Sequence, residues 1–216
     1  MTDWLRGSLV LVSDYSVPDP AQVWPLLQRR VDALADLGAH HVLVYASTTD
    51  PERVLVILVL HAHEPLRDLI RSRTFFDWFD AVGGVTDLPA VFAGELFDRV
   101  DLDGDLRSGA PPTIVSMVTP VDDVSALSAR VRESAAAFRA TGVRRFWSFK
   151  AFDDPHEMLI LQQVDDESSA RRWLHDSDDA AEWLSEAGVG AYPPVFIGRF
   201  CHMMAIDIPR RPGAGH

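Results

Sequence analysis

The sequence predicts an α+β fold in which one structural unit occurs twice in tandem. Residues 45–60 and 149–164 align without a gap, so that Asp50 and Asp154 differ in number by 104. The same offset relates residues along most of the chain, namely Val17/Val121, Asp19/Asp123, Gly38/Gly142, Pro51/Pro155, Leu55/Leu159, Arg67/Arg171, Gly84/Gly188, Pro89/Pro193, Phe92/Phe196 and Gly94/Gly198. Both copies also show the same order of strand-like and helix-like apolar patterns. The 216 residues are therefore expected to form two equivalent halves, each long enough to bury a core.

The first half is expected to contain a strand, a helix, two strands, a helix and a strand. Runs rich in apolar and β-branched residues predict strands over residues 8–15, 42–46, 54–60 and 91–100, and a second helix is expected after Glu64. Asp19 and Pro20 are typical of a helix start, and Gly38 is typical of a helix end. Pro25 interrupts this helix because proline lacks an N–H, so the helix is expected to be kinked there or to begin later.

The second half repeats the same order from Thr113. It is expected to contain a first strand, a helix over 124–138, a hairpin at 153–155, a helix around 171–173 and a final strand over 195–206. We expect residues 1–103 to form the first repeat, 104–112 a Gly/Pro-rich linker, 113–208 the second repeat and 209–216 a disordered tail.

Each half has the order of the split βαβ, ferredoxin-like unit, an antiparallel sheet with helices on one face. The face without helices is apolar in both copies, so it must pack against another surface. The other copy is available for this. The predicted fold is therefore an intramolecular α+β barrel, a pseudo-dimer within one chain, and it leaves open whether the protein is a monomer or a homodimer.

Composition excludes several classes of partner. The chain has 20 Lys and Arg against 32 Asp and Glu, a formal charge of −12 that disfavours nucleic acid and anionic membrane surfaces. The longest purely apolar run, Val54 to Leu60, is far shorter than a membrane span. A single cysteine, Cys201, and the absence of a signal-peptide pattern at residues 1–6 favour a cytoplasmic location.

Three segments of the second half carry a resemblance to a known family. These are Asp-Asp-Pro-His-Glu-Met-Leu-Ile-Leu from Asp153, Val-Asp-Asp-Glu-Ser-Ser-Ala-Arg from Val164 and Ala-Gly-Val-Gly-Ala-Tyr-Pro-Pro-Val from Ala187. They resemble the dimeric α+β barrel superfamily, in particular the antibiotic-biosynthesis-monooxygenase-like proteins. That family includes cofactor-independent monooxygenases of polyketide quinones, haem-degrading enzymes and isomerases. The resemblance implies a pocket between helices and sheet, without fixing its chemistry.

Polar residues interrupt the strands of the second copy where the first copy is apolar. Ser116, Ser148, Lys150, Gln162 and Gln163 stand where the first copy has Val12, Val44, Ala46, Leu58 and Val59. Burying an unpartnered polar group costs about 1–3 kcal/mol, so the set indicates a lined pocket or a hydrogen-bonded network. The alternative is an edge or partly wetted sheet face. In a pocket, Lys150 could hold an anionic or phenolate ligand and Gln162 could orient it.

Aromatic residues are abundant, and most are expected to be core because they recur at helical spacing. Trp78, Trp147 and Tyr45 could nevertheless form the walls of a site for a flat ligand. Asp14 and Tyr15 leave the first strand together and could reach the same site.

His61 and His63 are the candidate metal ligands, because residues two apart on a strand project to one face. No third ligand is identifiable, and the second copy has Asp165 and Glu167 at these places, so the simpler interpretation is a polar helix start. His40 and His41 are adjacent on a strand, so their side chains are expected to point to opposite faces at the surface. The sequence contains no Gly-rich phosphate loop, no Gly-x-Ser-x-Gly and no His-Glu-x-x-His.

Two hypotheses for function follow. The first is a cofactor-independent monooxygenase that acts on an aromatic or polyketide-like molecule, whose own anion activates oxygen. The second is a non-catalytic protein that binds a small hydrophobic or aromatic molecule in the same pocket. No cofactor is expected under either hypothesis, and haem binding is a weaker third possibility.

Overall fold

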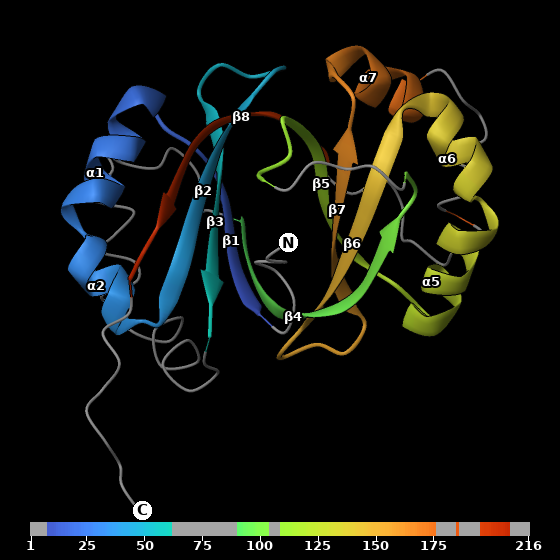
Figure 1. Ribbon diagram of the computed structural model, residues 1–216, viewed down its shortest axis with the longest axis horizontal. Helices are drawn as coiled ribbons and strands as arrows, with labels where there is room; N and C mark the ends of the chain where they lie inside the picture. Colours follow the sequence, from blue (N-terminus) through green and yellow to red (C-terminus); the bar gives the residue numbers. More distant parts are fainter. Residues whose placement is uncertain (1–7, 62–89, 104–108, 176–184, 186–194, 208–216) are drawn as a thin grey trace, which may run out of the picture.

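The protein is a closed antiparallel barrel with helices packed outside it (Figure 1). The computed structural model describes residues 8–61, 90–103, 109–175, 185 and 195–207. Around the barrel the strands run in the order β1-β3-β2-β8-β5-β7-β6-β4, and β4 closes the circle onto β1. The predicted α+β barrel of two ferredoxin-like repeats is confirmed.

The described elements of the two halves occur in the same order, apart from α7, whose equivalent positions in the first half lie outside the described residues. The first half contains β1 (Leu9–Ser16), a 3-10 turn (Pro20–Gln22), α1 (Val23–Arg29), α2 (Val31–Asp36), β2 (Ala39–Ser47), β3 (Arg53–Leu60) and β4 (Ala90–Asp101). The second contains β5 (Thr113–Pro120), α5 (Val124–Glu133), α6 (Ala135–Thr141), β6 (Val143–Ala151), β7 (Glu157–Val164), α7 (Glu167–His175) and β8 (Val195–Ala205). The first three strands of each half begin and end at residues that differ by the predicted offset.

The last strand of each half joins that half to the other. β4 pairs with β1 of its own half and with β6 of the second, while β8 pairs with β5 and with β2. The register repeats the sequence offset, since Leu9 pairs with Glu95 and Thr113 pairs with Arg199. The irregularities repeat as well. A bulge leaves Phe97 out of the β4–β6 register, and the equivalent Cys201 is left out of the β2–β8 register.

Helix ends follow the local sequence signals. Asp19 accepts a hydrogen bond from the N–H of Ala21, but the α-helix itself starts at Val23. Pro25 therefore lies in the first turn, where its missing N–H breaks no helical bond, and the helix begins later, one of the two predicted outcomes. Gly38 has a φ of 80° and the equivalent Gly142 a φ of 95°, the left-handed conformation that glycine adopts most easily at a helix end.

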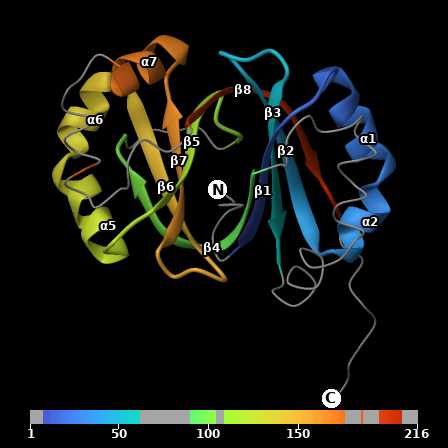
Figure 2. The same cartoon turned by 180° about the vertical axis from the view of Figure 1, so that it is seen from behind.

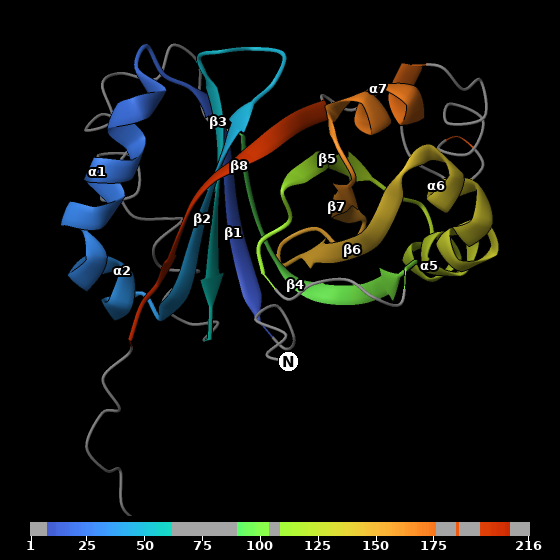
Figure 3. The ribbon, with the colours of Figure 1, turned by 45° about the horizontal axis from the view of Figure 1, so that its top comes forward.

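The apolar residues within the described ranges form three clusters. One lies between the first-half sheet and its helices and includes Leu27 and Val56, and a second lies between the second-half sheet and its helices and includes Leu127 and Phe146. The third fills the barrel interior with residues from both halves, among them Phe149. Figure 2, seen from behind, and Figure 3, tilted so that the top comes forward, show α1 and α2 outside one side of the barrel and α5, α6 and α7 outside the other.

Some expectations lie outside the described residues. These are the second helix of the first half, which carries Trp78, most of the linker and the tail over 209–216. The domain boundaries therefore stay predictions. No helix within the described part of the chain is long and apolar enough to cross a membrane.

Candidate functional site

Strand alternation divides the predicted site residues between two faces of the barrel wall. Ser148 and Gln162 lie on the face that α5 to α7 cover, on the same side as Phe146 and Ile160. Tyr45 and Trp147 lie in the interior cluster. The structure thus does not bring these four residues together, and Trp78 lies outside the described residues.

Ser148 and Gln162 are both almost completely buried, with 0% and 1% of their surface exposed. They lie diagonally on the neighbouring strands β6 and β7, a relation that places such side chains about 7 Å apart. The Ser148 hydroxyl donates a long hydrogen bond of 3.5 Å to the Asp98 carbonyl. Among the described residues the amide oxygen of Gln162 has no hydrogen-bond partner. A buried acceptor in this state is costly unless another molecule donates to it.

An ion pair between Asp98 and Arg132 connects the buried polar residues of the sheet to helix α5. Arg132 Nη2 lies 2.8 Å from Oδ1 and 2.6 Å from Oδ2 of Asp98, and Arg132 Nη1 donates to the Ser128 carbonyl at 3.2 Å. Ser128 is 6% exposed, and its hydroxyl also has no partner within the described part of the chain. Ser128, Arg132, Asp98 and Ser148 therefore form a connected series with Gln162 beside it, and this set is called the helix-face group below.

The first half has a different set of side chains at the equivalent places. Trp24 stands in place of Ser128 and stacks on His202, the equivalent of Asp98, with ring centroids 4.7 Å apart and 13° between the planes. Val44 and Leu58 stand in place of Ser148 and Gln162 and belong to the apolar cluster. The first half thus fills with rings and alkyl groups the place where the second half carries small and polar side chains.

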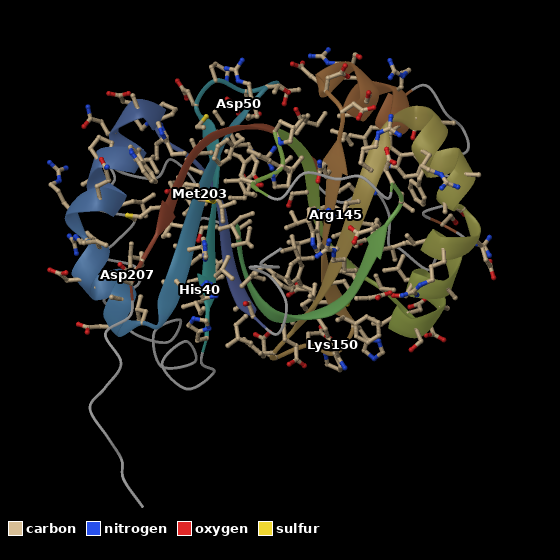
Figure 4. The ribbon with its side chains drawn as sticks, in the orientation of Figure 1. His40, Asp50, Arg145, Lys150, Met203 and Asp207 are labelled. Carbon is tan, nitrogen blue, oxygen red and sulfur yellow. The ribbon has the colours of Figure 1, made fainter. Side chains whose placement is uncertain are left out.

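Lys150 lies at the border of this region. It is half-buried, two residues beyond Ser148 on the same face of β6, and it pairs in register with Glu95 and Met158. Figure 4 shows Lys150 near the lower end of β6, with Arg145 higher on the same strand. An ammonium at this position could meet a ligand anion at the border of the helix-face group.

The interior aromatics are packed as core. Tyr45 is 1% exposed, its ring meets Phe200 edge-on at 5.7 Å, and burial raises its pKa, so the side chain stays a neutral phenol. Trp147 is 3% exposed, and the Arg145 guanidinium lies 5.3 Å from its ring centroid. Their role toward a ligand remains a prediction.

Asp14 lies where β1 ends, beside the barrel interior, and it forms an ion pair that the sequence analysis missed. Arg53 Nε donates to Asp14 Oδ1 at 2.7 Å and Nη2 donates to Oδ2 at 2.5 Å. Hydrogen bonding to Asp14 raises the pKa of the guanidinium. Arg53, Ser128 and Asp98 were all missed. A position-by-position comparison of the copies would have identified Ser128, because its counterpart is a tryptophan.

Three histidines, His40, His41 and His61, form a cluster at one end of β2 and β3. His40 Nδ1 lies 2.6 Å from His41 Nδ1, and His40 stacks on His61 with centroids 3.9 Å apart. The expectation that His40 and His41 point to opposite faces is wrong, because a bulge between Ala39 and His41 breaks the alternation. Within the described ranges no group of three or more His, Cys, Asp or Glu is arranged to hold a metal. His63 lies outside these ranges.

Comparison with known proteins identifies the fold class. No family model matches the chain, and no curated protein sequence matches it. Solved structures do match: an anthrone oxidase-like protein superposes with a TM-score of 0.67 at 14% identity, covering 97% of both chains. The chain has the fold of the dimeric α+β barrel superfamily.

Two further solved structures share this fold at similarly low sequence identity. A monooxygenase-like protein from Listeria innocua is 10% identical with a TM-score of 0.52, covering 93% of this chain and 98% of its own. A mutant chlorite dismutase from Candidatus Nitrospira defluvii is 11% identical with a TM-score of 0.55, covering 91% and 92%. Proteins with different activities thus have this architecture, so the site has to indicate the function.

Proposed function

We propose that the protein binds a small aromatic or polyketide-like molecule at the helix-face group of its second half. The observation that carries this proposal is the Gln162 amide oxygen, buried and without a partner in the described structure, on the strand next to Ser148. A ligand hydroxyl or N–H that donates to this oxygen would satisfy it. The surrounding wall is apolar, which suits a flat ring system.

Lys150 would make the proposed site prefer a negatively charged ligand. Its ammonium lies on the same strand face as Ser148, and it would favour the anionic form of an acidic phenol or enol at the border of the site. A ligand with a deprotonated oxygen near Lys150 and a hydroxyl toward Gln162 satisfies both groups. Hydroxylated anthrones and quinols combine these features.

The second candidate function is cofactor-independent monooxygenation at this same site. Stabilisation of a substrate anion by Lys150 favours it, because an electron-rich carbanion reacts with dioxygen directly. The substrate CH2 loses one proton, its carbon forms a bond to dioxygen, and the resulting hydroperoxide loses water to leave a carbonyl. One dioxygen is consumed and one water is released per turnover. Solved proteins of this fold that are named anthrone oxidase-like and monooxygenase-like support this candidate.

Binding of a hydroxylated anthrone, 1,8-dihydroxyanthrone, to the whole protein, followed by calorimetry, tests the first candidate, and this probe is called anthrone below. Ser128→Trp installs the side chain of the first half and should abolish binding, while Gln162→Leu should weaken it about tenfold or more through the lost hydrogen bond. Ser125→Trp places the same indole on the exposed side of α5 and should bind as the original protein does. Unchanged anthrone affinity in both Ser128→Trp and Gln162→Leu contradicts the proposal.

Oxygen uptake separates catalysis from binding. Stoichiometric binding of anthrone without oxygen consumption identifies a binding protein. Catalytic uptake that falls in Lys150→Met while anthrone affinity changes less identifies the oxygenase, because the charge matters most for the anion that reacts.

A further inference from the structure

We propose that the barrel interior holds a second small-molecule site, specific for a monocyclic phenol, where β1 and β5 end. A cavity of about 200 Å³ lies there, and Val12, Leu55 and Phe92 of the interior cluster form much of its wall. It lies on the opposite side of the barrel wall from the helix-face group. The inference therefore does not depend on the proposed function.

Equivalent residues of the two halves line the cavity together. Val12 and its equivalent Ser116 both line it, and so do Asp14 and its equivalent Val118. In each pair one half supplies an alkyl group and the other a polar group. Ser116 is 3% exposed, so its hydroxyl is a buried polar group on a mostly apolar wall.

An oriented ion pair lies at the mouth of the cavity. In addition to its two bonds to Asp14, Arg53 donates from Nη1 to the Val195 carbonyl at 3.3 Å, and its guanidinium lies 5.4 Å from the Phe196 ring centroid. The side chains of Arg53 and Asp14 are 23% and 18% exposed. Their equivalents in the second half are Glu157 and Val118, so closing the barrel at this end does not require the pair.

Volume and charge define the ligand. A cavity of about 150 Å³ engineered in another protein holds benzene, so this one has room for a substituted ring. Asp14 already neutralises Arg53, so the mouth carries no net charge, and a carboxylate would meet the Asp14 oxygens. A neutral phenol hydroxyl can donate to Asp14 and accept from Arg53, while its ring contacts Leu55 and Phe92. This arrangement favours phenols over benzoates and over plain toluene.

The test uses p-cresol, with 4-methylbenzoate and toluene as matched probes, on the whole protein labelled at its methyl groups for NMR. We expect p-cresol to shift the methyl signals of Val12, Leu55 and Val118 in a saturable manner, and to bind about tenfold more tightly than either probe. Asp14→Asn and Ser116→Val, the latter copying Val12, should each weaken p-cresol binding about threefold to tenfold. Equal affinity for the three probes, or p-cresol binding that Asp14→Asn and Ser116→Val both leave unchanged, overturns the proposal.

A control separates this site from the helix-face group. Ser128→Trp should abolish anthrone binding and leave p-cresol binding intact, whereas Ser116→Phe should fill the cavity and do the reverse. Should Ser116→Phe fail to fold, Asp14→Asn decides the matter, because it changes almost no volume. Loss of p-cresol binding in Ser128→Trp would contradict an interior site.

Discussion

The indole of Trp24 stacks on the imidazole of His202 and thereby joins helix α1 of the first half to strand β8 of the second. At the equivalent positions of the other half, an ion pair between Arg132 of α5 and Asp98 of β4 makes the corresponding connection. The Trp24–His202 stack and the Arg132–Asp98 ion pair thus lie at equivalent places in the fold but differ in chemistry. Their contributions to stability should therefore differ in size and in salt dependence.

Removing the stack and the ion pair one at a time should show that their contributions to stability differ. Trp24→Ala should lower the free energy of unfolding by about 2 kcal/mol, since it deletes a large, partly buried ring. Arg132→Ala should cost at most about 1 kcal/mol, because the Arg132 side chain is 53% exposed and water and salt screen the pair. Urea unfolding at low and at 1 M salt measures both, and we expect salt to reduce only the Arg132 effect. A cost for Arg132→Ala that exceeds the cost for Trp24→Ala contradicts this account.

Replacing Gln162 by leucine, its counterpart in the first half, should stabilise the protein. The substitution removes a buried amide oxygen that has no partner among the described residues, and such an atom costs about 1–3 kcal/mol. We expect the urea midpoint to rise by an amount equal to about 1 kcal/mol while anthrone binding falls, the exchange of stability for function expected at a binding site. A destabilised Gln162→Leu protein would show that the amide is satisfied in the folded state.

The duplicated barrel could be predicted from the sequence because a constant offset and apolar periodicity both survive along the chain. The faces of individual side chains could not all be predicted. Phe97 is bulged, so Asp98 points toward α5, whereas unbroken alternation would place it in the interior. Cys201 is bulged in the same way, so His202 points toward α1 and its ring reaches Trp24. A bulge depends on the pairing of two distant strands, so neither strand shows it alone.

The site was predictable only in part, for a related reason. Polar substitutions between the copies correctly drew attention to Ser148 and Gln162 as buried polar groups. Grouping them with Tyr45 and Trp147 ignored the alternation of β6, which separates Trp147 from Ser148 by the thickness of the sheet. The Arg53 ion pair was missed because an arginine at a strand start is usually solvated.

Two equivalent glycines should tolerate alanine unequally. Both have positive φ, so each Gly→Ala change should cost about 1–2 kcal/mol from backbone strain. Among the described residues, a Cβ at Gly38 would meet no atom within 4 Å, whereas at Gly142 it would lie 2.5 Å from Ser169 Oγ and 2.7 Å from Ser169 Cβ. We therefore expect Gly142→Ala to cost a further 1–3 kcal/mol, roughly the penalty of overpacking. Thermal or urea unfolding of the two variants measures the difference.

A second change tests the stated cause of this difference. In a Ser169→Gly background, which lacks the clashing side chain, Gly142→Ala should cost little more than the strain shared with Gly38→Ala, measured against Ser169→Gly alone. Equal costs for Gly38→Ala and Gly142→Ala would show that the helix end moves freely to accommodate a methyl group.

The histidine cluster should make stability fall as the pH is lowered from about 6.5 to about 4, the interval between the unfolded and folded pKa values of His40. Burial, followed by repulsion from His61 and His41, lowers the pKa of His40 to about 4. Burial, followed by repulsion from His61, also lowers the pKa of His41. Between these pH values the unfolded chain binds more protons than the folded chain. The stabilising effect of neutral imidazoles is therefore complete above the unfolded value and is lost toward acid.

His40→Gln should flatten the dependence of the unfolding free energy on pH in this interval, because one depressed imidazole no longer titrates. His156→Gln is the control, since His156 is exposed and lies outside the cluster, and it should keep the original slope. The shifted carboxyls contribute equally to His40→Gln and to the original protein. Asp166, whose pKa the hydrogen bond from Ser168 lowers to about 2, affects stability mainly below its ordinary value of 3.8. Glu157, whose pKa is raised by burial and by Asp153 and Asp154, is unchanged in His40→Gln. Urea unfolding at pH steps from 7 to 4 gives the slopes, and an unchanged slope in His40→Gln would show that His40 is protonated in the folded state.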